Sequence, residues 1–150
     1  MSLFGALEIS ASGLTAQRLR MDVTSANLAN AQTTRTPGGG PYRRQTVVLQ
    51  ESAPASGAES FAGNLAGALG GGEGAPAGVE VAAIVPDTTP LRRVYEPGNP
   101  EADGQGYVTY PNVNPVTEMT DLIDASRSYQ ADITAMQTTK TVFQKTIELL

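Results

Sequence analysis

The sequence has 150 residues, a net charge of −5, and neither cysteine nor histidine. The mild acidity argues against a nucleic-acid binder, because the domains of such proteins are usually strongly basic. The two missing residue types exclude disulfide bonds, cysteine nucleophiles and the zinc sites built from them, and remove the side chain best suited to proton transfer near neutral pH.

The apolar content is low for a protein that folds alone. Leu, Ile, Val and Phe together number 31, about a fifth of the chain, and Trp is absent. We therefore expect the protein to complete its core against a partner surface.

The first segment, residues 2–31, has the pattern of an amphipathic helix with heptad character. Gly5 and Gly13 weaken the helix, and several other positions of the same stripe are polar, so its packing partner is not a simple two-stranded zipper. The predicted seam of this helix consists of Leu7, Leu14, Met21 and Leu28.

The N-terminus lacks the features of a secretory signal peptide, since the first basic residue is Arg18. No stretch of the sequence approaches the roughly 20 apolar residues of a membrane-spanning helix. We expect no cleaved signal peptide and no direct membrane insertion.

The middle of the chain contains four short runs with β-strand character, separated by turn-forming stretches rich in Pro, Gly, Asp and Asn. The runs are residues 42–50, 79–85, 91–95 and 106–110. Residues 53–78 consist almost entirely of Ala, Gly, Pro and Ser, which predicts a flexible low-complexity loop.

The last segment is a long helix. Asn114 followed by Pro115 is a typical helix start, and no Gly or Pro follows from residue 116 onward. A three-four apolar spacing over four to five heptads favours a coiled coil over a core helix of a small bundle, although Lys140 interrupts the stripe. The predicted seam of this helix consists of Leu122, Tyr129, Ile133, Met136, Phe143, Ile147 and Leu150.

The order of these segments predicts a mainly α protein with a small β-rich middle. A compact middle keeps its entry and exit close, so the long terminal helices should form an antiparallel coiled-coil-like pair with a β-hairpin and loop head between them. We assign residues 1–31 and 115–150 to the helical domain and residues 32–114 to the middle.

The glycine-rich stretch RTPGGGPYRR, residues 35–44, raises the question of a phosphate-binding site. It lacks the motif of a phosphate-binding loop and precedes a strand instead of a helix, so a turn or hinge is favoured. Arg43 and Arg44 should point to opposite faces of the strand, and Arg35 is isolated, so they form no single basic patch.

A second stretch resembles a calcium loop, with oxygen ligands at Asn99, Glu101 and Asp103 and a glycine at Gly104. Its twelfth position, which should be a bidentate glutamate, is Tyr110, and no flanking helix pair is expected. The sequence therefore predicts no metal site there.

Asp121 and Asp124 share a face near the start of the last helix, where acidic residues usually complement the helix dipole. Without histidine, cysteine or an acid pair with a buried pattern, we predict neither an enzyme nor a cofactor.

Several stretches resemble the bacterial flagellar basal-body rod proteins: SGLTAQ, SANLANAQT, GGPYRRQTV, VYEPGNPEADGQGYVTYPNVNP and EMTDLIDASRSYQADITAMQTTK. The resemblance covers roughly residues 1–50 and 88–150. The SANLANAQT stretch is shared across rod, hook and related axial proteins, whereas PYRRQ and the VYEPGNPEADGQGYVTYPNVN stretch are specific to the C-type subunit of the proximal rod. Pro115 and the long loop 53–78 depart from the usual pattern.

The resemblance implies a structural subunit of a helical tube that transmits torque around a central export channel. Its implied partners are copies of itself, other rod proteins, the MS-ring and rod-base proteins, and the flagellar type III export apparatus. The implied location is the periplasmic rod of the basal body. The motif residues, implied to mark a hinge between helix and β-rich part, are Ser25, Asn27, Leu28, Asn30, Thr33, Tyr42, Arg43 and Arg44.

Two alternatives stay open at this point. One is a different axial subunit, from the distal rod or related to the hook, because SANLANAQT alone would allow it. The other is an anion- or nucleic-acid-binding module, for which the candidate residues are Arg35, Arg43, Arg44, Arg92 and Arg93.

Overall fold

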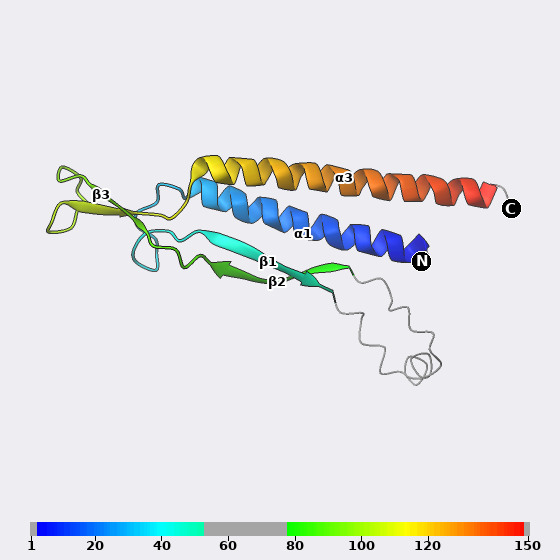
Figure 1. The fold of residues 1–150 in the computed structure, drawn as a ribbon, viewed down its shortest axis with the longest axis horizontal. Helices are drawn as coiled ribbons and strands as arrows, with labels where there is room; N and C mark the ends of the chain where they lie inside the picture. The colour runs from blue at the N-terminus through cyan, green and yellow to red at the C-terminus, as the bar shows by residue number, and fades with distance from the viewer. Residues whose placement is uncertain (1–2, 53–77, 149–150) are drawn as a thin grey trace, which may run out of the picture. The chain divides into compact units, whose positions relative to one another are not determined.

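The computed structural model describes residues 3–52 and 78–148 (Figure 1). Leu150 and all but the last residue of the predicted loop 53–78 lie outside these residues. The elements in chain order are α1 (Leu3–Ala29), β1 (Gln45–Glu51), β2 (Val79–Pro86), β3 (Arg92–Tyr95), β4 (Tyr107–Tyr110) and α3 (Pro115–Glu148).

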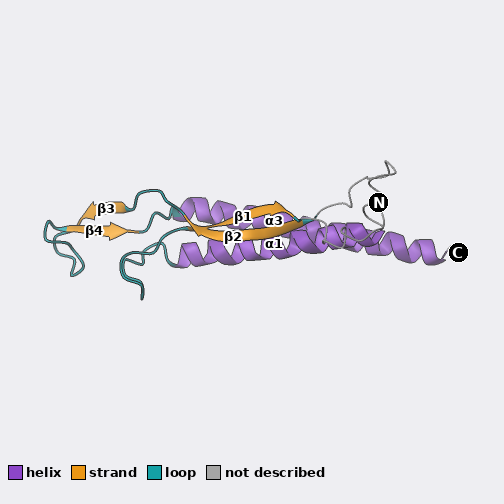
Figure 2. Ribbon diagram, turned by 90° about the horizontal axis from the view of Figure 1, so that it is seen from below, coloured by secondary structure: helices purple, strands orange, loops and turns teal. Residues whose placement is uncertain are grey.

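The secondary structure follows the prediction. Both terminal helices and all four strands are present, and their bounds lie within three residues of the predicted ones where the chain is described. The strands form two separate two-stranded sheets, β1 with β2 and β3 with β4 (Figure 2). The expected fold class, two terminal helices flanking a small β-rich middle, is thus confirmed.

The chain divides into two compact units, and both helices contribute to each. Unit 1 comprises Met1–Gln17, Leu49–Ala82 and Arg127–Leu150, as far as these residues are described. Unit 2 comprises Arg18–Val48 and Ala83–Ser126.

In unit 1, small residues of α1 allow close contacts with other elements. A Cβ at Gly13 would lie 3.1 Å from Oδ2 of Asp132 on α3, so the glycine that weakens the helix also makes room for its neighbour. The hydroxyl of the preceding residue, Ser12, accepts a hydrogen bond of 3.1 Å from the backbone N–H of Val79, the first residue of β2.

In unit 2, the hairpin of β3 and β4 contains one of the few fully buried apolar side chains. The strands are antiparallel, and Val94 lies opposite Val108, which is completely buried. Val23 of α1, Pro111 and Ala125 of α3 are the other buried apolar residues among the described residues of this unit. Few apolar side chains of unit 2 are fully buried, and several contacts between its elements are polar.

The loop that joins β3 to β4 is ordered by the carboxylate of Asp103. Its Oδ1 accepts hydrogen bonds of 2.9 Å from the backbone N–H groups of Gln105 and Tyr107, and its Oδ2 accepts one of 2.7 Å from Arg93. Gly106 has a φ of +82°, a conformation that a residue with a side chain rarely adopts. The loop therefore has a defined conformation although little of it is buried.

The last helix begins where the sequence predicts. Asn114 is the N-cap: its side-chain oxygen accepts a hydrogen bond of 3.1 Å from the backbone N–H of Val116, and its carbonyl accepts one of 3.0 Å from Glu118. Pro115 occupies the first helical position, where a missing N–H has no cost.

Candidate functional site

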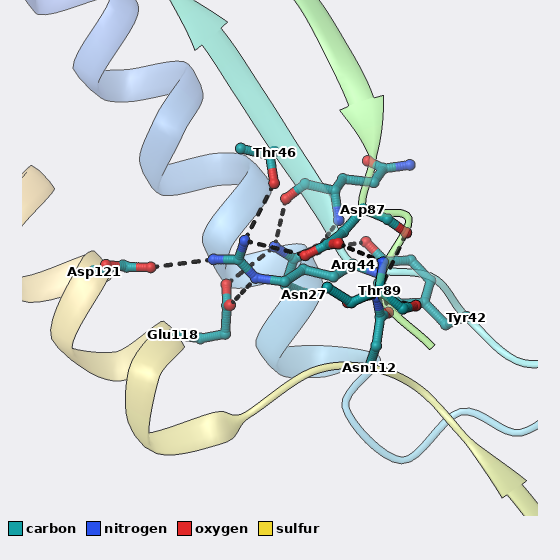
Figure 3. Close-up of polar contacts among 10 residues, drawn as sticks. Asn27, Tyr42, Arg44, Thr46, Asp87, Thr89, Asn112, Glu118 and Asp121 are labelled. Atoms are coloured by element: carbon teal, nitrogen blue, oxygen red, sulfur yellow. Dashed lines mark hydrogen bonds and ion pairs between the residues drawn. The ribbon is translucent and has the colours of Figure 1, made fainter. Parts of the chain in front are cut away.

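Asn27, near the end of α1, is 1% exposed and uses its full hydrogen-bonding capacity (Figure 3). Its Nδ2 donates to the backbone carbonyl of Gln45 at 2.8 Å and to Oε2 of Glu118 at 3.0 Å. Its Oδ1 accepts from the backbone N–H of Gln45 and from the Tyr42 hydroxyl, both at 2.9 Å. One side chain thus joins α1, the start of β1 and the first turn of α3.

Arg44 precedes β1 and faces several carboxylates (Figure 3). Its Nε donates to Oε1 of Glu118 at 2.6 Å, and one terminal nitrogen donates to Oδ2 of Asp121 at 3.2 Å. The other terminal nitrogen lies 3.8 Å from Oδ2 of Asp87. The hydrogen bond with Glu118 raises the pKa of Arg44, and the charges of Glu118, Asp121 and Asp87 act in the same direction.

Asn112 connects the segment before α3 to the same place. Its Oδ1 accepts a hydrogen bond of 2.9 Å from the backbone N–H of Arg44, and its Nδ2 donates to the Thr89 hydroxyl at 2.8 Å. The carboxylate of Asp87 accepts a hydrogen bond from the backbone N–H of Thr89, and this bond lowers the pKa of Asp87. The backbone N–H of Asp87 in turn donates to the Arg44 carbonyl at 2.7 Å.

We call this cluster the polar junction. It ties together the end of α1, the start of β1, the turn after β2 and the start of α3, all within unit 2. Burial raises the pKa of the Tyr42 hydroxyl, and the Glu118 carboxylate adds to this effect, so Tyr42 stays a neutral donor. The members of the polar junction are Asn27, Tyr42, Arg44, Gln45, Asp87, Thr89, Asn112, Glu118 and Asp121.

The structure separates the predicted motif residues into two groups. Those in the polar junction are Asn27, Tyr42 and Arg44. Ser25 and Arg43 are exposed, and Leu28 is half-buried. Asn30 donates to the Ala26 carbonyl near the end of α1, and the Thr33 hydroxyl donates to Asn30 Oδ1 at 3.1 Å. Their predicted role as a hinge stays a prediction.

Sequence reasoning missed the partners of Arg44 and Asn27. From the sequence alone, Asp121 is expected only to complement the helix dipole, and nothing distinguishes Glu118. The available signal was their spacing: Glu118 and Asp121 lie one turn apart on the face of α3 toward Arg44. Nothing in the spacing of Asp87, Thr89 or Asn112 pointed to this place.

The predicted helix seams are partly exposed in the single chain. Phe143 and Ile147 are 37% and 55% exposed. On α1 the buried positions are Ala16, Val23, Thr24 and Asn27 instead of the predicted stripe. The half-buried seam residues are Leu7, Leu14, Met21, Leu28, Leu122, Tyr129, Ile133 and Met136. Whether the seams pack against other subunits stays a prediction.

Three of the five arginines that are candidates for anion or nucleic-acid binding make contacts within the chain. Arg44 is paired in the polar junction, and Arg93 is paired with Asp103. The guanidinium groups of Arg92 and Arg93 lie over the rings of Tyr110 and Tyr107, 5.4 and 4.9 Å from the ring centroids.

The candidate calcium ligands bond within the chain. Asn99 Oδ1 accepts from the backbone N–H of Glu101, the Glu101 carboxylate accepts from Thr34, and Asp103 organises its own loop. Within residues 3–52 and 78–148, no group of three or more acidic side chains could hold a metal ion. Of the helices formed by these residues, none combines the length and apolar character that crossing a membrane requires.

Comparison with known proteins identifies the family. The family model described as "Flagella basal body rod protein" matches residues 7–35, and the one described as "Flagellar basal body rod FlgEFG protein C-terminal" matches residues 105–149. The flagellar basal-body rod protein FlgC of Bacillus subtilis is 45% identical over 99% of each chain. The protein of the same name from Borreliella burgdorferi is 43% identical over 100% of this chain and 99% of its own, and that from Salmonella typhimurium is 41% identical over 99% and 98%. The chain therefore belongs to the FlgC family of flagellar basal-body rod proteins.

Proposed function

We propose that this chain is a structural, non-catalytic subunit of the proximal rod of the flagellar basal body. The proposal is supported by the shared name of full-length relatives from distant bacteria. In it, α1 and α3 pack with the helices of neighbouring subunits into a tube that transmits torque and surrounds the export channel.

The observation that carries the assembly is the exposed apolar surface of α3. Val116, Met119 and Ile123 lie on one helical face and are 72%, 54% and 52% exposed, and Ile147 near the other end is 55% exposed. Apolar surface left in water forgoes about 25 cal/mol per Å² of stabilisation. When two different surfaces of the same subunit bind each other from copy to copy and the copies do not close into a ring, a helical polymer forms. Such a polymer would bury these apolar residues between subunits.

We assign the tube core to residues 1–31 and 115–150 and the outer part to residues 32–114. The proposed partners are copies of the chain, other rod proteins, and the MS-ring and rod-base proteins. In this proposal the chain reaches the periplasm through the flagellar type III export apparatus and keeps its N-terminus.

The test is deletion of the gene in its own bacterium, followed by complementation with the full-length chain. The deletion should abolish flagella and motility, and basal bodies purified from the complemented strain should contain the chain. Intact mass spectrometry of this material should give a protein that begins at or next to Met1. The proposal would be refuted if the deletion cells were motile. It would also be refuted if the chain in the complemented strain, located with an attached label, were confined to the distal rod or hook.

A further inference from the structure

Two of the most deeply buried side chains of unit 2 are polar. Among the described residues, the largest fully buried side chains are Glu118, Val108 and Asn27, so two of the three are hydrophilic. A carboxylate that is only 1% exposed is costly unless it is paired and hydrogen-bonded. The composition of this core therefore requires an explanation other than the filling of space.

Hydrogen bonding at the centre of the polar junction is complete. Both oxygens of Glu118 accept hydrogen bonds, one from Arg44 and one from Asn27. The amide of Asn27 has four partners, two of which are the backbone groups of Gln45. A buried network in which every member is satisfied holds one arrangement and penalises alternatives that leave a member without a partner.

Stability alone does not account for the Arg44–Glu118 pair. The Glu118 side chain is 1% exposed and that of Arg44 is 24% exposed, so the pair is largely removed from water. Replacing such a pair by apolar residues of similar volume is often neutral or stabilising, because desolvation of the charges offsets their attraction. Apolar contacts, however, are non-directional, whereas hydrogen bonds require particular distances and angles. The polar pair therefore restricts the geometry more than an apolar pair would.

The hydrogen bonds of the polar junction restrict the path of the chain between α1 and β1. Gln45 is the first residue of β1, and Asn27 holds both of its backbone groups. The preceding residue, Arg44, is held by its backbone to Asn112 and by its side chain to Glu118 on α3. These bonds fix where β1 starts relative to the end of α1 and the first turn of α3.

We propose that Arg44 and Glu118 are positioning residues that set the direction in which β1 leaves α1, and thereby the shape in which a subunit can join the rod, while adding little net stability. The inference rests on the proposed function, because in a repeated assembly the same contacts must fit in every copy.

The test replaces the pair with apolar residues of similar length in the full-length chain, as Arg44→Met with Glu118→Leu. In the purified monomer, amide exchange of β3 and β4 should match that of the unchanged chain. In cells, the amount exported should also be unchanged, whereas the amount in purified basal bodies should fall by about tenfold or more, which corresponds to about 1.4 kcal/mol of assembly free energy.

Two controls accompany the double variant. Arg127→Met with Asp124→Leu makes the same kinds of change at two exposed positions of α3 outside the polar junction, and basal bodies should contain normal amounts of this variant. Glu118→Leu alone removes the carboxylate that Arg44 and Asn27 share, so it should speed exchange of the Gln45 amide as well as reduce incorporation.

Each outcome decides between specific geometry and simple stability. Normal incorporation of the Arg44→Met, Glu118→Leu variant would overturn the inference. So would faster amide exchange throughout β3 and β4 in that variant, because the pair would then be a stabilising element. Absence of the unchanged chain from basal bodies would instead refute the proposed function, and the inference with it.

Discussion

The side-chain amide of Asn27 pairs with the backbone of Gln45 as a neighbouring strand would. Nδ2 donates to the Gln45 carbonyl at 2.8 Å, and Oδ1 accepts from the Gln45 N–H at 2.9 Å. Two residues in an antiparallel sheet exchange the same two bonds. A helix residue thus supplies the strand partner for the first residue of β1, which explains why a small amide side chain is suited to this buried position.

Replacing Asn27 by alanine should destabilise unit 2. The Asn27→Ala change removes partners from Gln45, Tyr42 and Glu118, and an unsatisfied buried polar group costs about 1–3 kcal/mol. Water that enters the space left behind can replace some of these partners. We therefore expect the loss in the free energy of unfolding, measured by urea denaturation, to be limited to about 2–3 kcal/mol.

The matched control is the second asparagine of the same motif. Asn30 lies just beyond the end of α1 and is half-buried; its Nδ2 donates to the carbonyl of Ala26, and among the described residues its Oδ1 accepts only from the Thr33 hydroxyl. Asn30→Ala should therefore cost less than about 1 kcal/mol. Equal losses for Asn27→Ala and Asn30→Ala would contradict the assignment of Asn27 as the centre of the polar junction.

Removal of the N-cap should loosen the start of α3. Asn114→Ala deletes the acceptor for the Val116 N–H, and loss of such a cap typically costs about 1 kcal/mol. Amide exchange in the first turn, at residues 116–118, should accelerate, whereas Asn114→Asp should preserve protection because a carboxylate also accepts this bond. Unchanged exchange in Asn114→Ala would show that Pro115 alone defines the helix start.

The hairpin of β3 and β4 should lose stability in acid. The backbone N–H of Tyr107 holds the pKa of the Asp103 carboxyl below its ordinary value of 3.8, and hydrogen bonds from Gln105 and Arg93 act in the same direction. A pKa that is depressed in the folded state gives stabilisation that is present above 3.8 and lost as the pH falls through the folded value.

NMR titration of the monomer would follow this loss. Protection of the Tyr107 amide should decrease as the Asp103 carboxyl becomes protonated, at a pH below 3.8. In Asp103→Asn the acid-dependent step should disappear, and the loop should exchange faster even at neutral pH. A Tyr107 amide that stays equally protected through the titration would disprove the role of this carboxylate.

The predicted seam of α3 leads to a prediction about assembly. Met136→Asp and Phe143→Asp place a carboxylate on a stripe that should be dry in the rod, where an unpaired charge costs several kcal/mol. Because Phe143 is partly exposed in the single chain, this cost should appear in assembly more than in monomer folding. Both changes should abolish rod incorporation and motility while leaving export intact.

The controls for the seam are outward-facing polar residues of the same helix. Gln130 and Thr138 are exposed, so Gln130→Asp and Thr138→Asp should have weaker effects on motility. Lys140 is the exception on the seam, and in the rod it should reach a polar channel or an acidic neighbour. Normal rods with Met136→Asp and Phe143→Asp would show that this helix does not build the tube core.

Local signals were sufficient to predict the elements of the fold. The 34 residues of α3 follow from a long three-four apolar spacing after Asn114 and Pro115, and the strands follow from β-prone runs between turn formers. Each of these signals lies within a few residues of the element that it predicts.

The candidate site depends on contacts that no local signal encodes. Arg44 appeared to be one member of a basic pair, and only the packing of α3 against the start of β1 shows that Glu118 and Asp121 neutralise it. Likewise, the sequence indicates only that Gly13 weakens a helix, whereas the structure shows that it also makes room for Asp132.

The distance along the chain between Asn27 and Glu118 also determines when the junction closes. The two residues are 91 positions apart, and their contact requires most of the chain to be available. Contacts between such distant residues form late, because the loop between them must close first. A nascent chain therefore carries an open junction, and its final geometry is set only after the start of α3 has been synthesised.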